Sequence, residues 1–152
     1  MKKQSLLLEQ IDQKLKEFDA VSKVLPPPTG WIKAIRMALG ISLVQLGSKL
    51  SISKQSVSEM EKREQSESIT IKSLRQAGEA MDLKLVYGFI SKDGSLEALI
   101  ERRAMELAVR IVKRTSNTMR LEDQENSEER IQKAIIQRTE ELKRDLPKAL
   151  WD

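Results

Sequence analysis

The stretch that decides the fold is ISLVQLGSKLSISKQSVSEME, residues 41–61. Two short helices, separated by one sharp break near Ser51, bring the apolar side chains of this stretch to one side. The side chains expected to face inward are Val44, Leu50, Val57 and Met60. The spacing therefore predicts two helices joined by a tight turn, which is either a helix-turn-helix or an ordinary helical hairpin.

Start signals and a small residue support the two-helix interpretation. Ser42 and Ser53 precede the two helices, and a serine hydroxyl there accepts a hydrogen bond from a first-turn N–H group. Gly47 lies where the first helix is expected to pass close to the second. A larger side chain at this position is expected to push the two helices apart.

The charge around this stretch is mainly positive, in a chain whose net charge is +4. The basic residues between Gly30 and Gln65 are Lys33, Arg36, Lys49, Lys54, Lys62 and Arg63, and the acidic ones are Glu59, Glu61 and Glu64. Taken alone, this mixture is typical of an ordinary solvated face. Beside a helix-turn-helix it favours binding to DNA phosphates.

Composition excludes several classes of function. The 152 residues include no cysteine and no histidine, which excludes disulfides, most zinc sites and histidine acid–base catalysis. We therefore expect no enzymatic activity, no cofactor and no metal. No apolar run reaches the roughly 18 residues of a membrane span. The start MKKQSLLLEQIDQKL carries charges too soon for a signal peptide, so we expect a cytoplasmic, nucleoid-associated protein without membrane contact.

Residues 30–83 resemble the phage repressor and Cro class of helix-turn-helix proteins, often called XRE. The resemblance rests on WIKAIRMAL ending at Gly40, the pair Leu43 and Leu46, Gly47, Val57, and the helical segments in ITIKSLRQAGEAMDL. It implies a mainly α bundle in which an ion pair between Arg36 and Glu61 ties the first helix to the third. The turn position that is usually glycine in this class is Ser51, so a left-handed backbone there would be mildly strained.

The same resemblance implies which side chains contact DNA. The candidates for reading bases are Lys54, Gln55, Ser58 and Glu59, all on the exposed side of the second helix. Lysine can donate to guanine, glutamine can pair with adenine, and glutamate can accept from cytosine. The candidates for phosphate contacts are Ser42, Ser56, Lys62 and Lys33. Leu43 stands where the class often has a polar contact residue, so the first helix is not expected to read bases there.

An apolar run, LKLVYGFIS, follows this region and predicts a β-strand closed by the Asp93-Gly94 turn. No second strand of comparable strength exists in the sequence. We therefore expect the strand to pair with its copy in a homodimer through Leu85, Tyr87 and Phe89. A continued helix is the alternative, which Gly88 disfavours. Two recognition helices about one DNA turn apart would then read an inverted-repeat operator.

Helical segments flank the central region. The N-terminal segment has an apolar stripe of Leu7, Leu8, Ile11, Leu15 and Phe18, and a stiff linker of prolines follows it. Ser95 can cap a later helix with a basic face and an apolar stripe of Leu96, Leu99 or Ile100, Ala104, Leu107 and Ile111. A further helix begins near Ser127 and ends before Pro147. The predicted division is 1–25 helix, 26–29 linker, 30–83 helix-turn-helix domain, 84–94 dimerisation strand and turn, and 95–152 helical region.

A narrower resemblance covers nearly the whole chain. The segments LPPPTGWIKAIRMALGIS, LKLVYGFIS and NTMRLEDQ resemble the mobile mystery protein A family, which is encoded beside a Fic-domain protein. The resemblance implies an antitoxin that represses its own operon and restrains a Fic toxin. The flanking helices would then bind that partner or enlarge the dimer core. The alternative is a protein-binding adaptor or Fic inhibitor in which the helix-turn-helix is only a scaffold.

Fic enzymes are commonly inhibited by a helix with Ser or Thr, three residues, Glu, and then Gly or Asn. Two segments come near this pattern, SLLLEQ with Glu9 and TMRLED with Glu122. Neither segment has the final glycine or asparagine. Restraint of the partner by steric capture, or by repression alone, therefore stays open beside an inhibitory glutamate.

Overall fold

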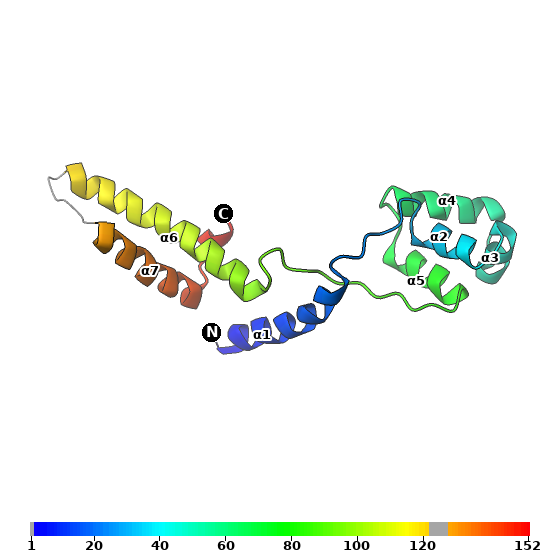
Figure 1. Ribbon diagram of the computed structural model, residues 1–152, viewed down its shortest axis with the longest axis horizontal. Helices are drawn as coiled ribbons and strands as arrows, with labels where there is room; N and C mark the ends of the chain where they lie inside the picture. The colour runs from blue at the N-terminus through cyan, green and yellow to red at the C-terminus, as the bar shows by residue number, and fades with distance from the viewer. Residues whose placement is uncertain (1, 122–127) are drawn as a thin grey trace. The chain divides into compact units, whose positions relative to one another are not determined.

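The computed structural model describes residues 2–121 and 128–152, and within those ranges the chain is mainly α-helical, as expected, and contains no strand. The chain divides into two compact units, Lys23–Tyr87 and Met1–Ser22 with Gly88–Asp152 (Figure 1). Among the described helices, none combines the length and apolar character that a membrane crossing requires. Each unit has its own buried core.

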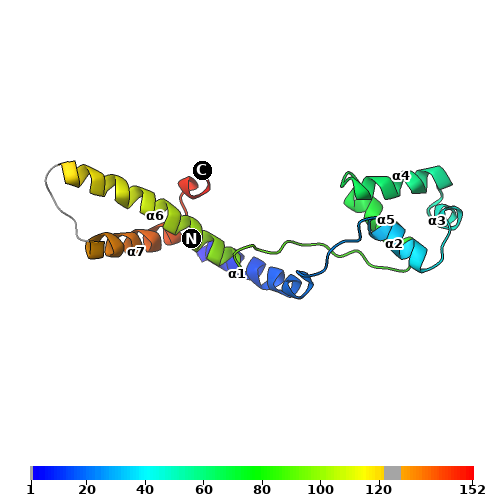
Figure 2. The same cartoon turned by 45° about the horizontal axis from the view of Figure 1, so that its top comes forward.

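The first unit, here called the four-helix unit, contains α2 to α5. These helices are α2 (Trp31–Ala38), α3 (Leu43–Leu50), α4 (Lys54–Gln65) and α5 (Ile71–Ala80), which gather around one core (Figure 2). Its buried apolar residues are Ile32, Leu46, Val57, Met60, Ala77 and Met81. All four helices contribute to this core, and Met81, the residue after the end of α5, completes it.

The inward side of α3 differs from the prediction at one position. Val44 is 62% exposed, so its expected inward orientation is wrong. Leu43 instead packs against the core, together with Leu46 and Leu50. The helix begins at Leu43, and the spacing i, i+3, i+7 from that residue keeps these three leucines on one face and turns Val44 to solvent.

The helices of this unit end in a common way, with one residue in the left-handed conformation after the last turn. These residues are Gly40, Ser51, Glu67 and Asp82. After α3, the Ile52 N–H donates to the Gly47 carbonyl oxygen at 2.9 Å, which closes the helix and reverses the chain. Ser51 has φ 58° and ψ 39°, so the strained backbone expected at this position is present.

The second unit, here called the hairpin unit, is built on α6 (Leu96–Leu121) and α7 (Glu128–Asp145), which lie side by side in opposite directions (Figures 1 and 2). A short 3-10 helix, η2 (Lys148–Trp151), follows α7. The buried apolar residues are Ala104, Ala108, Leu142 and Leu150. The two alanines allow close approach of the helices, and Leu107, Ile111 and Ile135 pack around them. Ala104, Leu107 and Ile111 belong to the stripe predicted for α6.

The N-terminal segment belongs to the hairpin unit and forms α1 (Lys2–Lys16) and the 3-10 helix η1 (Glu17–Val21). Its predicted apolar stripe is correct only in part. Leu8, Leu15 and Phe18 are half-buried, whereas Leu7 and Ile11 are exposed. The helix therefore packs through one apolar side and leaves a second apolar side uncovered.

The predicted strand forms neither strand nor helix within its own chain. Residues 83–91 are irregular and connect α5 to α6. Val86, Tyr87 and Phe89 are 69%, 62% and 82% exposed, while Leu85 is half-buried. The Asp93-Gly94 turn is present, with φ 93° at Gly94 and the Gly94 N–H donating to the Ser91 carbonyl oxygen. The helical alternative is therefore wrong, and pairing with a second copy stays a prediction.

Candidate nucleic-acid interface

Serine caps fix the starts of α3 and α4, as the sequence predicted. The Gln45 N–H donates to the Ser42 hydroxyl oxygen at 3.0 Å, and the Ser42 N–H donates to Gln45 Oε1 at 2.8 Å. The Ser56 N–H donates to the Ser53 hydroxyl oxygen at 3.1 Å. Both helices therefore have a defined first turn and direction.

Gly47 sets the distance between α3 and the turn that leads into α4. A Cβ atom at Gly47 would lie 2.7 Å from the Ile52 carbonyl oxygen and 3.4 Å from Val57 Cγ2. The first of these distances is a collision with backbone, which cannot move without opening the turn. The close approach expected at Gly47 is therefore real, and it fixes where α4 begins.

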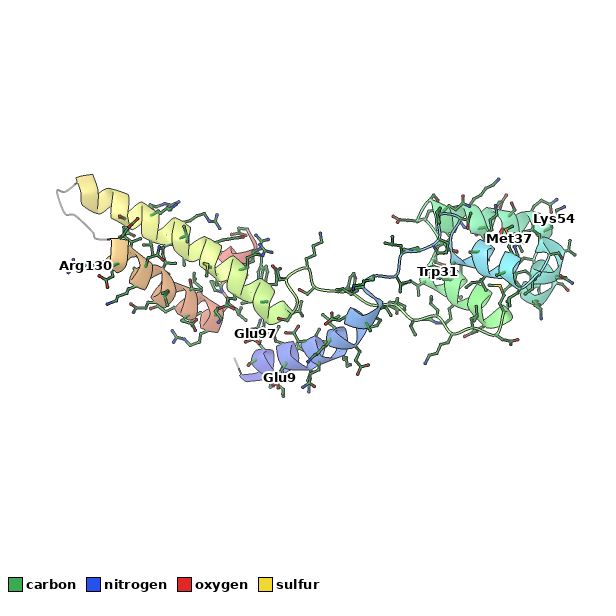
Figure 3. All side chains as sticks on the ribbon, in the orientation of Figure 1. Glu9, Trp31, Met37, Lys54, Glu97 and Arg130 are labelled. Atoms are coloured by element: carbon green, nitrogen blue, oxygen red, sulfur yellow. The ribbon has the colours of Figure 1, made fainter. Side chains whose placement is uncertain are left out.

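The two sides of α4 have different roles. Val57, Met60 and Glu61 are buried against the rest of the unit. The predicted base-reading residues Lys54, Gln55 and Glu59 are exposed, and Ser58 is half-buried. Figure 3 shows Lys54 at the outer edge of the four-helix unit. The start of α4 thus presents donors and an acceptor to solvent on a rigid support.

The predicted phosphate-binding residues lie on three helices of the same unit. Ser42 and Lys62 are exposed, and Ser56 and Lys33 are half-buried. Ser42 and Ser56 stand at the starts of α3 and α4, where first-turn N–H groups and the helix dipole favour an anion. Hydroxyl and ammonium groups are both donors suited to phosphate oxygens.

A buried ion pair connects α2 to α4. Arg36 Nε donates to Glu61 Oε2 at 2.8 Å, and Arg36 Nη2 donates to Glu61 Oε1 at 3.1 Å. Arg36 Nη1 also donates to the Ile41 carbonyl oxygen at 3.0 Å. Only 11% of the arginine side chain and 6% of the glutamate side chain are exposed. The pair expected from the resemblance is thus present, and it orients α4 relative to α2.

Glu64 has a structural role that sequence reasoning missed. Its carboxylate accepts the Trp31 N–H at 2.7 Å and the Ile32 N–H at 2.8 Å, and so caps the start of α2. The residue that precedes α2, Gly30, has no side chain to do this. The two partners are more than thirty positions apart in the chain, so no local pattern indicates the cap.

The carboxylates of Glu61 and Glu64 are both bound to groups of the four-helix unit. Glu61 is used inside the core by Arg36, and Glu64 is used by the N-terminus of α2. The other charged side chains of residues 30–65 are wholly or partly exposed to solvent. The basic ones are Lys33, Lys49, Lys54, Lys62 and Arg63, and the acidic one is Glu59. Because Arg36 and Glu61 neutralise each other and Glu64 is half-buried, the fully exposed charged side chains of this stretch are basic apart from Glu59.

The basic side of α6 is partly neutralised within the hairpin unit. Arg102 donates to both carboxylate oxygens of Asp93, at 2.8 and 3.2 Å, and to Glu106 at 2.9 Å. The hydrogen bond from Arg102 lowers the pKa of Asp93 below its ordinary value of 3.8. Arg103 lies over the ring of Trp151, 5.9 Å from its centroid. Neither arginine is therefore simply a solvated charge.

One of the two glutamates proposed as Fic-inhibitory groups, Glu9, lies on α1. Glu9 is exposed on α1, and it borders a surface hollow together with Ser5 and Glu97 (Figure 3). Ser5 and Glu9 are one helical turn apart, as the inhibitory pattern requires. Glu122 lies outside the described residues.

Comparison with protein-family models, with curated proteins and with solved structures finds no match to this chain in any of the three. The site itself consists of two capped helices joined by a tight turn, with polar and basic side chains exposed on α4.

Proposed function

We propose that this chain is a sequence-specific DNA-binding protein that represses transcription through a helix-turn-helix formed by α3 and α4. The observation that carries the proposal is the exposed first turn of α4, which holds Lys54 and Gln55 on a helix whose other side is fixed in the core. A rigid helix with polar side chains at its N-terminal end fits the major groove of DNA.

Each candidate residue has a role in this proposal. Lys54 donates to guanine, Gln55 pairs with adenine, and Glu59 accepts from a cytosine amino group, with Ser58 beside them. Ser42, Ser56, Lys62 and Lys33 bind phosphates and fix the register of the helix on the duplex. The buried ion pair supports this assignment, because Arg36 neutralises the carboxylate of Glu61 inside the unit.

We also propose a homodimer that pairs two copies of residues 84–90. Within the described part of the chain, these residues make no backbone hydrogen bond with one another or with other segments, and their apolar side chains are largely exposed. Pairing across a twofold axis through Leu85, Tyr87 and Phe89 would satisfy the backbone and cover those side chains. Such a dimer would read an inverted-repeat operator.

The chain has no cysteine, which permits a direct test of this dimer. Single cysteines introduced in turn at Leu85, Tyr87 and Phe89 are expected to give a disulfide-linked dimer at the position nearest the axis. A cysteine at Lys133, which is exposed on α7, is the control for random collision. Equal cross-linking at all four positions would contradict strand pairing.

The proposed biological role is that of an antitoxin which represses its own operon and restrains a Fic-domain toxin. Support comes from the sequence resemblance and from the size of the hairpin unit, which contains more residues than the four-helix unit. DNA binding does not require these additional helices. Their exposed apolar side chains, among them Leu7, Met105 and Ile136, are suited to contact with a protein partner.

The test of DNA binding uses the full chain and the DNA upstream of its own gene, at several salt concentrations. Specific binding with a steep salt dependence is expected. Lys54→Ala is expected to weaken specific binding by about 5- to 150-fold for each subunit, since a good base contact contributes about 1–3 kcal/mol. The matched control is Lys133→Ala, which removes the same charge from the hairpin unit and is expected to leave affinity unchanged.

The alternative function is a protein-binding adaptor in which the helix-turn-helix is only a scaffold. The exposed apolar side chains of the hairpin unit favour it. The same measurement separates the two functions. Absence of specific binding at physiological salt, or equal effects of the Lys54 and Lys133 substitutions, would favour the adaptor over the repressor.

A further inference from the structure

The N-terminal segment contacts the chain that leads into α6 at two separate points. One contact is made by Phe18 of η1 with Gly88, and the other by Asp12 of α1 with the first residues of α6. All of these residues belong to the hairpin unit. The contacts lie on either side of residues 89–95, so the N-terminal segment constrains both ends of this stretch.

The contact between Phe18 and Gly88 is close. A Cβ atom at Gly88 would lie 2.6 Å from two carbons of the Phe18 ring. Gly88 is not among the glycines with positive φ, so its backbone conformation is open to other residues. The absence of a side chain at this position is therefore explained by the ring that covers it.

Asp12 makes the second contact through its carboxylate. The Leu96 N–H donates to Asp12 Oδ1 at 2.7 Å, and the Glu97 N–H donates to Asp12 Oδ2 at 3.1 Å. Ser95 caps the following N–H group, from Ala98, at 3.0 Å. The free N–H groups at the start of α6 are thus shared between a local serine and a carboxylate from α1.

We infer that α1 and η1 hold residues 88–90, the end of the apolar segment 84–90, in position for pairing with a second copy of the chain, so that Phe18 and Asp12 are positioning residues for the dimer. The inference depends on the homodimer proposed above. Binding costs less when a segment is already ordered, because less conformational freedom is lost on association. Phe89, which is 82% exposed, gains this order because the Phe18 ring lies before it at Gly88 and the Asp12 cap lies after it at Leu96.

The first experiment measures the dimer dissociation constant of the full chain by sedimentation equilibrium. The variants are Phe18→Ala, Gly88→Ala and the double substitution. Each single change is expected to raise Kd by about tenfold, equivalent to about 1.4 kcal/mol. In the Phe18→Ala background, Gly88→Ala is expected to have less than about a threefold effect, because the ring that its Cβ would meet is gone.

The second experiment tests the cap. Asp12→Ala is expected to raise Kd, and Asp12→Asn is expected to raise it less, since the asparagine oxygen can still accept the Leu96 N–H whereas its NH2 group cannot accept the Glu97 N–H. Asp19→Ala is the charge-matched control, because Asp19 is an exposed acid of η1 in the same N-terminal segment. An equal effect of the Asp12→Ala and Asp19→Ala substitutions would overturn the role of the cap.

The outcomes separate this inference from the proposed function. If the original chain dimerises and binds its operator, but Phe18→Ala leaves Kd unchanged, the positioning role is wrong and the repressor proposal stands. Additive effects of Phe18→Ala and Gly88→Ala would also overturn the inference. A chain that is monomeric at all concentrations would overturn both the inference and the proposed dimer.

Discussion

The buried pair of Arg36 and Glu61 gives the sharpest prediction for stability. Glu61→Ala leaves the guanidinium buried with only the Ile41 carbonyl oxygen as a partner. Breaking a buried ion pair in this way costs about 3–5 kcal/mol. That is a large part of the stability of a small domain, which is commonly about 5–15 kcal/mol. We therefore expect Glu61→Ala to unfold much of the four-helix unit at moderate urea concentrations.

Removing both charges is expected to be far less harmful. In the Arg36→Met, Glu61→Leu double variant, apolar side chains of similar size fill the site and no charge is left unpaired. The Ile41 carbonyl oxygen still loses its donor, so the double variant is expected to cost about 1 kcal/mol. The two single changes should therefore be strongly non-additive.

The assay uses the two tryptophans, one in each unit. Trp31 begins α2, and Trp151 lies in η2, so Trp151→Phe leaves fluorescence that reports only on the four-helix unit. Urea unfolding of that background, with and without the changes, gives the free energies. A cost below about 1 kcal/mol for Glu61→Ala, or a double variant as unstable as the sum of the single ones, would refute the reasoning.

Three further predictions concern backbone strain, a pKa and inhibition of the partner. Ser51→Gly is expected to stabilise the four-helix unit by about 0.5–1 kcal/mol in the same urea assay, because glycine adopts the left-handed conformation without a steric penalty. An unchanged or lower midpoint would show that Ser51 is not strained. Arg102→Ala is expected to raise the pKa of Asp93 towards 3.8, measured by NMR titration of the carboxyl group. In the original chain, the small contribution of this pair to stability should be lost as the pH falls through the lowered pKa of Asp93. An Asp93 pKa that stays the same after Arg102→Ala would contradict the prediction. Glu9→Ala is expected to leave inhibition of a Fic partner's nucleotidyl transfer intact, because SLLLEQ lacks the final glycine or asparagine, whereas release of transfer would identify Glu9 as the inhibitory group.

The confirmed predictions mostly concern interactions between residues that are close together in the sequence. The caps at Ser42 and Ser53 need only the first turn of each helix, and both are present. The close approach at Gly47 follows from the same short stretch. The error at Val44 has a local cause as well, since α3 begins at Leu43 and its inward row follows from that start.

The missed features all join distant parts of the chain. Glu64 caps α2 from the end of α4, and Asp12 caps α6 from 84 residues away. A carboxylate in an amphipathic helix resembles any solvated acid in sequence, because its partner is a backbone N–H group that carries no side-chain identity. Periodicity can therefore predict where helices begin, but not which remote carboxylate completes a cap.

This limit bears directly on the candidate site. In sequence, Glu61 and Glu64 count against phosphate binding, whereas in the folded chain both are already bound to donors of the four-helix unit. Glu59 is the acid of α4 that stays exposed on the side of Lys54 and Gln55. An acid kept at such a position costs affinity for phosphate, and a cytosine amino group is a partner that would offset the cost. Glu59→Gln should accordingly raise affinity for unrelated DNA while lowering the preference for the operator, and a uniform rise on both DNAs would remove Glu59 from the base-reading set.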